Sequence, residues 1–155
     1  MPIQVDYDKF VQFRYHPDYL KGYRDYETPT EVSLELAKKL TSASIETSPI
    51  IADGGNFTFA SIKRGRGYTP VVVMTEKVFF ENSEVAGENL VYQLEKLFPK
   101  HKLLFLPWDR GDACGHTDGI LHAVGPNKLL VNLKVYPDKI AARMREILES
   151  CFKVI

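Results

Sequence analysis

Chemically active residues are concentrated in residues 109–119, Asp-Arg-Gly-Asp-Ala-Cys-Gly-His-Thr-Asp-Gly. His116 and Asp118 are two positions apart, so in an extended chain their side chains project to the same side. An imidazole can transfer protons and a carboxylate can bind a cation, so the pair could act together on a cationic substrate. Because apolar residues 103–106 and 120–124 predict flanking buried strands, we expect the segment to be a loop that carries a site.

A second candidate loop precedes the first by about sixty residues. Residues 53–56, Asp-Gly-Gly-Asn, separate a predicted strand at 49–52 from another at 57–62. Glycines inside strand-like sequence indicate a sharp bend or a close approach of the backbone to a ligand. We expect the two loops to contribute to one cavity.

Other interpretations of these residues stay open. Cys114, His116, Asp118 and His122 offer sulfur, nitrogen and oxygen donors, but zinc ligands usually come from two separated clusters, and we predict no metal and no cofactor. The glycines lack the G-x-x-x-x-G-K pattern of a phosphate loop. His116 could instead have a purely structural role, in which it fixes a turn by a hydrogen bond to Asp112 or Asp118.

The composition is that of an ordinary globular protein, with 45% hydrophobic and 26% charged residues. Twenty basic and twenty acidic residues give zero net charge, which argues against nucleic acid or anionic membrane as partner. The N-terminus has no signal-peptide pattern, and no apolar run approaches the length of a membrane span. We therefore expect one cytoplasmic domain over residues 1–155, with Cys114 and Cys151 as free thiols.

The N-terminal third contains one clear helix signal. Residues 1–28 are rich in aromatic side chains without a steady period, so they predict irregular structure with at most a short strand at 11–15. A helix is predicted from Thr28 as cap, with Pro29 in its first turn. Its apolar residues form one stripe that we expect to pack against the protein: Val32, Leu36, Ala37 and Leu40.

The rest of the chain predicts the order strand, strand, helix, strand twice, about fifty residues apart. The first set is strands at 71–74 and 78–80, a helix from Asn82 or Ser83 to near Pro99 with Leu90, Leu94 and Leu97 on its stripe, and a strand at 103–106. In the second set residues 128–131 match residues 77–80, and they are followed by a helix from Asp138 and a strand from Phe152. Such a period indicates an α/β repeat architecture. Because the sequence stops within a predicted strand, we expect a piece of a larger circular assembly or a chain that oligomerises.

The two loops together resemble the guanidino-group-modifying superfamily, most closely the agmatine deiminase and peptidylarginine deiminase-like family. In that family an acidic-Gly-Gly-Asn motif and a Gly-His-x-Asp motif are successive landmarks, and residues 53–56 and 115–118 match them. The resemblance covers about residues 29–155 and implies a pentein fold, an α/β propeller of ββαβ-type repeats. It implies that this chain is a partial propeller of about two to three blades, a fragment of a deiminase domain.

The resemblance also implies roles for single residues. His116 corresponds to the general acid/base and Asp118 to the carboxylate that grips the guanidinium. Asp53 stands where the family usually has a glutamate, and we assign Asp53, Asn56 and Asp112 as candidate substrate-binding residues. The family's nucleophilic cysteine comes from a motif that would lie beyond this sequence.

The implied function is hydrolytic deimination of a guanidinium compound, agmatine or an arginine derivative, by a cytoplasmic hydrolase of putrescine biosynthesis. Without the nucleophile we expect a truncated chain, incomplete or inactive alone. Cys114 could act as nucleophile, but it shares a predicted face with His116 and Asp118, whereas thiolate and acid/base should flank the substrate carbon. The alternative is a non-catalytic binding or assembly module, completed by a partner chain or by homo-oligomers that cover open sheet edges.

Overall fold

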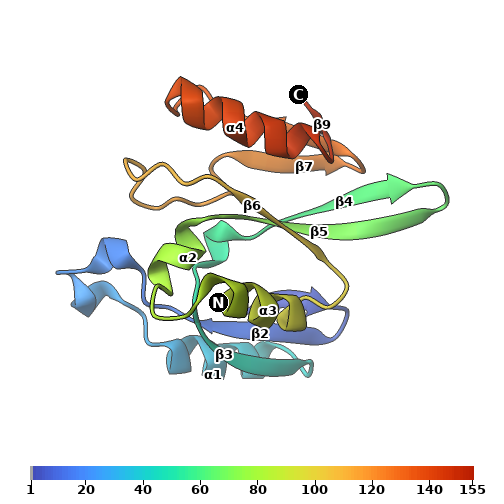
Figure 1. The fold of residues 1–155 in the computed structure, drawn as a ribbon. Helices are drawn as coiled ribbons and strands as arrows, with labels where there is room; N and C mark the ends of the chain where they lie inside the picture. Colours follow the sequence, from blue (N-terminus) through green and yellow to red (C-terminus); the bar gives the residue numbers. More distant parts are fainter. Residues whose placement is uncertain (1) are drawn as a thin grey trace. The chain divides into compact units, whose positions relative to one another are not determined.

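The computed structural model describes residues 2–155, which form mixed α/β structure with three small sheets (Figure 1). The strands are β1 (Ile3–Asp6), β2 (Lys9–Arg14), β3 (Ser44–Ile51), β4 (Thr58–Arg64), β5 (Gly67–Thr75), β6 (Lys102–Leu106), β7 (Leu121–Gly125), β8 (Lys128–Val131) and β9 (Lys153–Val154). The α-helices are α1 (Thr30–Leu40), α2 (Lys77–Glu81), α3 (Gly87–Leu97) and α4 (Asp138–Glu149). Short 3-10 helices are η1 (Asp18–Leu20), η2 (Arg24–Tyr26) and η3 (Gly54–Asn56).

Each sheet repeats one topology, with strand orders β1-β2-β3, β4-β5-β6 and β7-β8-β9. The first two strands are antiparallel and the third is parallel to the second. A parallel neighbour requires a crossover connection, and helices lie in it each time. The predicted ββαβ order is therefore confirmed, and it occurs three times instead of twice. Within residues 2–155 no sheet is closed, and the propeller with its blade number stays a prediction.

The chain divides into two compact units. The first contains the residues up to Gly54 together with Val78–Leu97, and the second contains Gly55–Lys77 together with Phe98–Ile155. None of the helices within residues 2–155 is long and apolar enough to cross a membrane.

The first unit begins with a sheet where the sequence predicted irregular structure. Strands β1 and β2 form an antiparallel hairpin, and β3 joins β2 in parallel. Val5, Val11 and Phe13 are buried, so this N-terminal segment contributes to a core. The short strand predicted at 11–15 is confirmed as β2. The irregular structure predicted before it was wrong, because β1 spans only Ile3–Asp6, which is too short for a clear alternation of apolar and polar residues.

Helix α1 differs from its prediction in two ways. It starts at Thr30 with Pro29 at the cap position, and no side chain caps it. The Thr30 hydroxyl instead accepts a hydrogen bond from the Tyr15 amide, 3.1 Å away. The predicted stripe packs only in part: Ala37 is half-buried, but the three larger members are well exposed, Val32 at 55%, Leu36 at 52% and Leu40 at 77%.

Residues 78–80 were predicted as a strand but lie in the short helix α2. The Asn82 side chain accounts for this, because its amide donates to the carbonyls of Val78 and Ile51, both at 2.8 Å. Its oxygen also accepts from the Ile51 amide at 2.8 Å. The strand that corresponds to β8 is therefore β5, not residues 77–80. Helix α3 starts at Gly87, later than predicted, but it buries the predicted stripe of Leu90, Leu94 and Leu97.

The second unit contains the other two sheets and α4, which covers the β7–β9 sheet (red and orange in Figure 1). The strands predicted at 103–106 and 120–124 are present as β6 and β7. Hydrophobic side chains from both sheets and from α4 form one core: Ile62, Val71, Val73, Leu106, Ile120, Leu121, Leu129, Leu133, Met144, Leu148 and Phe152. This core includes Leu106 at the end of β6, after which the candidate loop begins.

Candidate functional site

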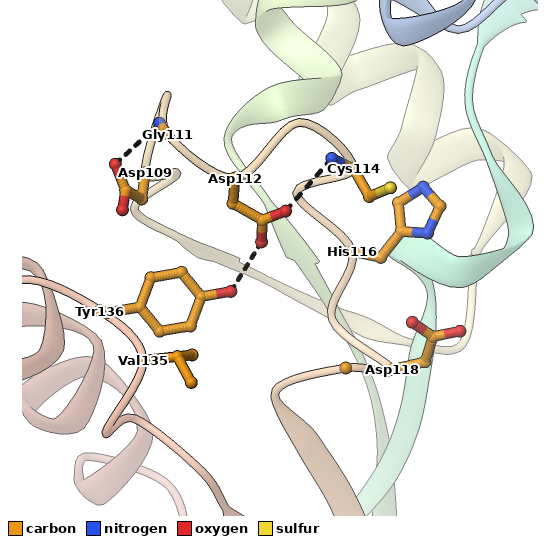
Figure 2. Close-up of a pocket in the computed structure, with 9 residues that line it drawn as sticks. Asp109, Gly111, Asp112, Cys114, His116, Asp118, Val135 and Tyr136 are labelled. Atoms are coloured by element: carbon orange, nitrogen blue, oxygen red, sulfur yellow. Dashed lines mark hydrogen bonds between the residues drawn. The ribbon is translucent and has the colours of Figure 1, made fainter.

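A cavity of about 570 Å³ opens in the second unit beside the loop between β6 and β7. Its lining residues are Asp109, Gly111, Asp112, Cys114, His116, Asp118, Gly119, Val135 and Tyr136 (Figure 2). Three carboxylates, an imidazole and a thiol therefore share one space. Among these lining residues none is a lysine or an arginine, so the cavity is acidic.

His116 and Asp118 are positioned by Gly55, the second glycine of the other predicted loop. The Asp118 amide donates to the Gly55 carbonyl at 3.1 Å. A Cβ atom on residue 55 would lie 2.9 Å from His116 Cγ, closer still to its Nδ1, and 3.0 Å from Asp118 Oδ2. Only glycine fits at this distance, because real Cβ atoms do not approach so closely. Gly55 of the first loop therefore contacts the second loop within this unit, but residues 53–56 are not among the lining residues of the cavity, and a cavity shared by the two loops stays a prediction.

Thr117 anchors the segment between the two candidate catalytic residues. It is fully buried, and its hydroxyl lies 3.0 Å from the Thr58 hydroxyl. Its neighbours on either side turn toward the cavity instead, as expected for alternating extended chain. The Thr75 hydroxyl fixes Gly115, the residue before His116, by donating a hydrogen bond to the Gly115 carbonyl at 2.6 Å. These two threonines were missed from the sequence, where nothing distinguishes them from surface threonines.

Asp112 organises the loop through its carboxylate. Oδ1 accepts from the amides of Cys114 and Gly115 at 3.1 and 3.0 Å, and Oδ2 accepts from the Tyr136 hydroxyl at 2.8 Å. Burial of the phenol and its bond to this carboxylate raise the pKa of Tyr136 above its ordinary value. Tyr136 and Val135 line the cavity from the segment after β8, and sequence reasoning did not find them.

Asp53 and Asn56 do not line this cavity. Asp53 belongs to the first unit, where the Tyr19 hydroxyl donates to its Oδ2 at 2.5 Å. Burial, and then this bond, raise the pKa of Tyr19. Asn56 is buried in the second unit, and its Oδ1 accepts from the amide and hydroxyl of Thr75 at 2.8 and 3.1 Å. The predicted substrate-binding roles of Asp53 and Asn56 stay predictions.

The two cysteines differ in their surroundings. Cys114 is exposed and lines the cavity, and in Figure 2 its sulfur points toward the imidazole of His116. Cys151 lies just after α4, with Sγ 3.2 Å from Lys102 Nζ and 3.4 Å from the Ser150 hydroxyl. Partial burial opposes ionisation of Cys151, but Ser150 and Lys102 outweigh it and lower the pKa of this thiol.

Within residues 2–155 no group of three or more histidine, cysteine, aspartate or glutamate side chains is placed to hold a metal ion. The donor set considered from the sequence included His122, and this residue is not part of the cavity lining.

No family model and no curated protein matches the sequence. The agmatine deiminase of C. jejuni matches with a TM-score of 0.64 at 16% identity, over 95% of this chain and 44% of that one. The chain shares the fold of agmatine deiminases. A substrate-bound cysteine-to-serine variant of the same enzyme matches with a TM-score of 0.67 at 18% identity, over 95% of this chain and 45% of that one. The Enterococcus faecalis agmatine deiminase matches with a TM-score of 0.66 at 16% identity, over 94% of this chain and 43% of that one.

The predicted resemblance to agmatine and peptidylarginine deiminases is therefore confirmed at the level of the fold. The similarity covers 95% of the chain, so it extends into the residues before Pro29 that the sequence left unassigned. The chain spans less than half the length of the deiminase structures it matches.

Proposed function

We propose that the acidic cavity binds a guanidinium compound, with His116 as general acid/base and Asp118 as the carboxylate that grips the cation. The observation that carries the proposal is that both side chains lie against Gly55 and line one cavity whose lining residues include no basic side chain. A carboxylate binds the planar guanidinium through two parallel N–H···O bonds, which fixes the plane of the ligand. The fold of agmatine deiminases supports this assignment.

The arrangement favours agmatine over arginine. Both ligands carry a guanidinium group, but agmatine has a second cation where arginine also carries a carboxylate. Asp109, Asp112 and Asp118 attract a dication, and the lining residues offer no ammonium or guanidinium group to neutralise a ligand carboxylate. We therefore propose a polyamine-like guanidinium compound as ligand.

Hydrolytic deimination also needs a nucleophile. A thiolate attacks the guanidinium carbon, ammonia leaves with a proton from the general acid, and water then hydrolyses the thiouronium intermediate. Cys151 does not line the cavity, and Cys114 is next to His116 instead of across the cavity from it (Figure 2). We propose that the chain alone binds the ligand and has little or no hydrolase activity.

Isothermal titration calorimetry with agmatine and arginine tests the binding. We expect agmatine to bind more tightly than arginine, and Asp118→Asn to weaken agmatine binding by about tenfold or more, since a charge-assisted pair is lost. Asp25→Asn, an exposed carboxylate of the first unit, serves as the matched control and should leave affinity unchanged. Absence of binding by the wild-type chain would refute the proposal.

A colorimetric assay for the ureido product tests turnover separately. Robust conversion of agmatine that survives Cys114→Ser would mean that the nucleophile has been missed. Conversion that Cys114→Ser abolishes would assign the nucleophile to Cys114.

A second candidate function is a non-catalytic assembly module. The exposed apolar stripe of α1 favours it, because a helix face of this kind usually packs against something. The two candidates are separated by the calorimetric experiment, since a pure assembly module would not bind agmatine.

A further inference from the structure

Lys77 is one of the largest fully buried side chains of the described residues, with 1% of its surface exposed. Lysine is almost never fully buried unless its ammonium group is paired, because removing a charge from water is costly. Lys77 lies two residues after the end of β5. It is the last residue of Gly55–Lys77, the first of the two chain segments that make up the second unit. Because burying a charged side chain costs free energy, a buried lysine is a candidate for a functional role.

Lys77 contacts the loop that lines the cavity. Its Nζ donates to the Ala113 carbonyl at 2.5 Å and lies 5.5 Å from the centre of the Trp108 ring. Its Cδ lies under Gly115, where an added Cβ would be 2.9 Å away, and Gly115 has a φ of +59° that favours glycine. One side chain therefore contacts the beginning, middle and end of the segment that precedes His116.

The loop itself connects these contacts. The Trp108 indole donates to the Asp112 carbonyl at 2.9 Å, and the Asp112 carboxylate accepts from the Gly115 amide. Movement of the lysine would therefore be transmitted to the backbone on which His116 stands. The same loop carries three carboxylates, which repel one another, and a cation bound to its backbone reduces this repulsion.

We propose that Lys77 is the positioning residue of the cavity: its ammonium group, bound to the Ala113 carbonyl and to the face of Trp108, holds the loop in the conformation that presents His116 and Asp118. Lys77 does not line the cavity and has no direct role toward the ligand. The part of the proposal that concerns the loop stands on geometry alone, and the part that concerns affinity rests on the proposed function.

Trp108 is the only tryptophan in the sequence, so its fluorescence reports on this loop alone. In Lys77→Met we expect the acrylamide quenching constant of Trp108 to rise about twofold or more, because the loop loses its anchor. Lys77→Arg retains the cation and its donors and should restore most of the protection. Lys96→Met is the matched control, since Lys96 lies over the Tyr92 ring at 4.3 Å in the first unit and should leave Trp108 unchanged.

Calorimetry with agmatine supplies the second measurement. We expect Lys77→Met to weaken binding about tenfold, and Lys77→Arg to stay within about threefold of wild type. If wild type fails to bind agmatine, the proposed function fails while the fluorescence comparison still decides the role of Lys77. Unchanged quenching and affinity in Lys77→Met would overturn the proposal.

Loss of folding is also decisive. Where Lys77→Met does not fold, Lys77→Gln replaces it, because glutamine is uncharged but keeps an N–H donor. If both uncharged variants fail to fold while Lys77→Arg folds, Lys77 is a residue of the core and the positioning role is refuted. Far-UV circular dichroism of each variant gives the fraction folded.

Discussion

Single residues in the cavity divide into those that hold the loop and those whose side chains are exposed to the cavity. The Asp112 carboxylate uses both oxygens for bonds to two backbone amides and to Tyr136. Asp118 instead has an exposed side chain at the cavity. Two carboxylates six residues apart therefore have different tasks, which residue type alone does not reveal.

Alanine substitution should separate these tasks. Asp112→Ala leaves two amides and a phenol without their acceptor, and we expect the free energy of unfolding to fall by about 1–3 kcal/mol. Asp118→Ala should change this free energy by less than about 0.5 kcal/mol while agmatine binding is lost. Urea unfolding measures the first quantity and calorimetry the second. Equal destabilisation by the two variants would contradict the division.

Cys151 should react faster than an ordinary thiol at mildly alkaline pH. Its lowered pKa means that the thiolate is populated at a pH below the ordinary value of 9.0, and Lys102 contributes to this. The rate of alkylation by iodoacetamide should rise with pH at lower values than for a free thiol, and Lys102→Met should move that rise to higher pH. Mass spectrometry resolves the two cysteines, and the rate at Cys114 provides the internal control. If the pH dependence of Cys151 alkylation is unchanged in Lys102→Met, the Lys102 ammonium group does not lower the pKa of this thiol.

At the scale of elements, the site depends on one close approach of backbone to side chain. The 3-10 turn η3 and strand β4 bring Gly55 against the loop from β6 to β7. Any residue other than glycine at position 55 would place its Cβ atom too close to the His116 side chain. The adjacent Gly54 is not restricted in this way, because an added Cβ would meet only Ile3 Cδ1, at an ordinary 3.6 Å.

The two glycines form a matched pair of variants. Gly55→Ala should abolish agmatine binding and destabilise the protein by about 1–3 kcal/mol, because His116 and Asp118 must shift. Gly54→Ala should retain binding within about twofold. Calorimetry and thermal unfolding give both quantities. Retained binding in Gly55→Ala would show that the loop adapts and that the close approach is not required.

At the scale of the whole molecule, the apolar side chains of Val32, Leu36 and Leu40 on α1 stand out because they are more than half exposed to solvent. The fold is that of less than half of an agmatine deiminase chain. Large apolar side chains in a row on one helix face favour association, because burial of each would contribute about 1.5–3 kcal/mol.

We therefore expect concentration-dependent self-association. Leu36→Glu places a charge in the stripe and should shift the protein toward monomer. Val124→Glu, at an apolar side chain of the second unit that is 54% exposed, is the control and should not. Sedimentation velocity over a hundredfold range of concentration measures the effect, and a wild-type chain that is monomeric throughout would contradict it.

The sequence determined the elements whose evidence is local. The stripe of α3, the start of α4 at Asp138, the strands β6 and β7, and the two motif loops follow from local sequence signals that span only a few residues. His116 and Asp118 were predicted as site residues for the same reason, since their types and spacing lie in one short segment.

Tertiary structure alone decided what depends on long-range pairing. Residues 78–80 are strand-like in composition, but Asn82 binds the Val78 carbonyl and β5 already has both its neighbours. The apolar stripe of α1 is a local property, whereas its burial depends on what packs against it. Lys77, Tyr136 and the threonines at 75 and 117 became visible only in the fold, because burial and hydrogen bonding join residues that are up to 62 positions apart in sequence.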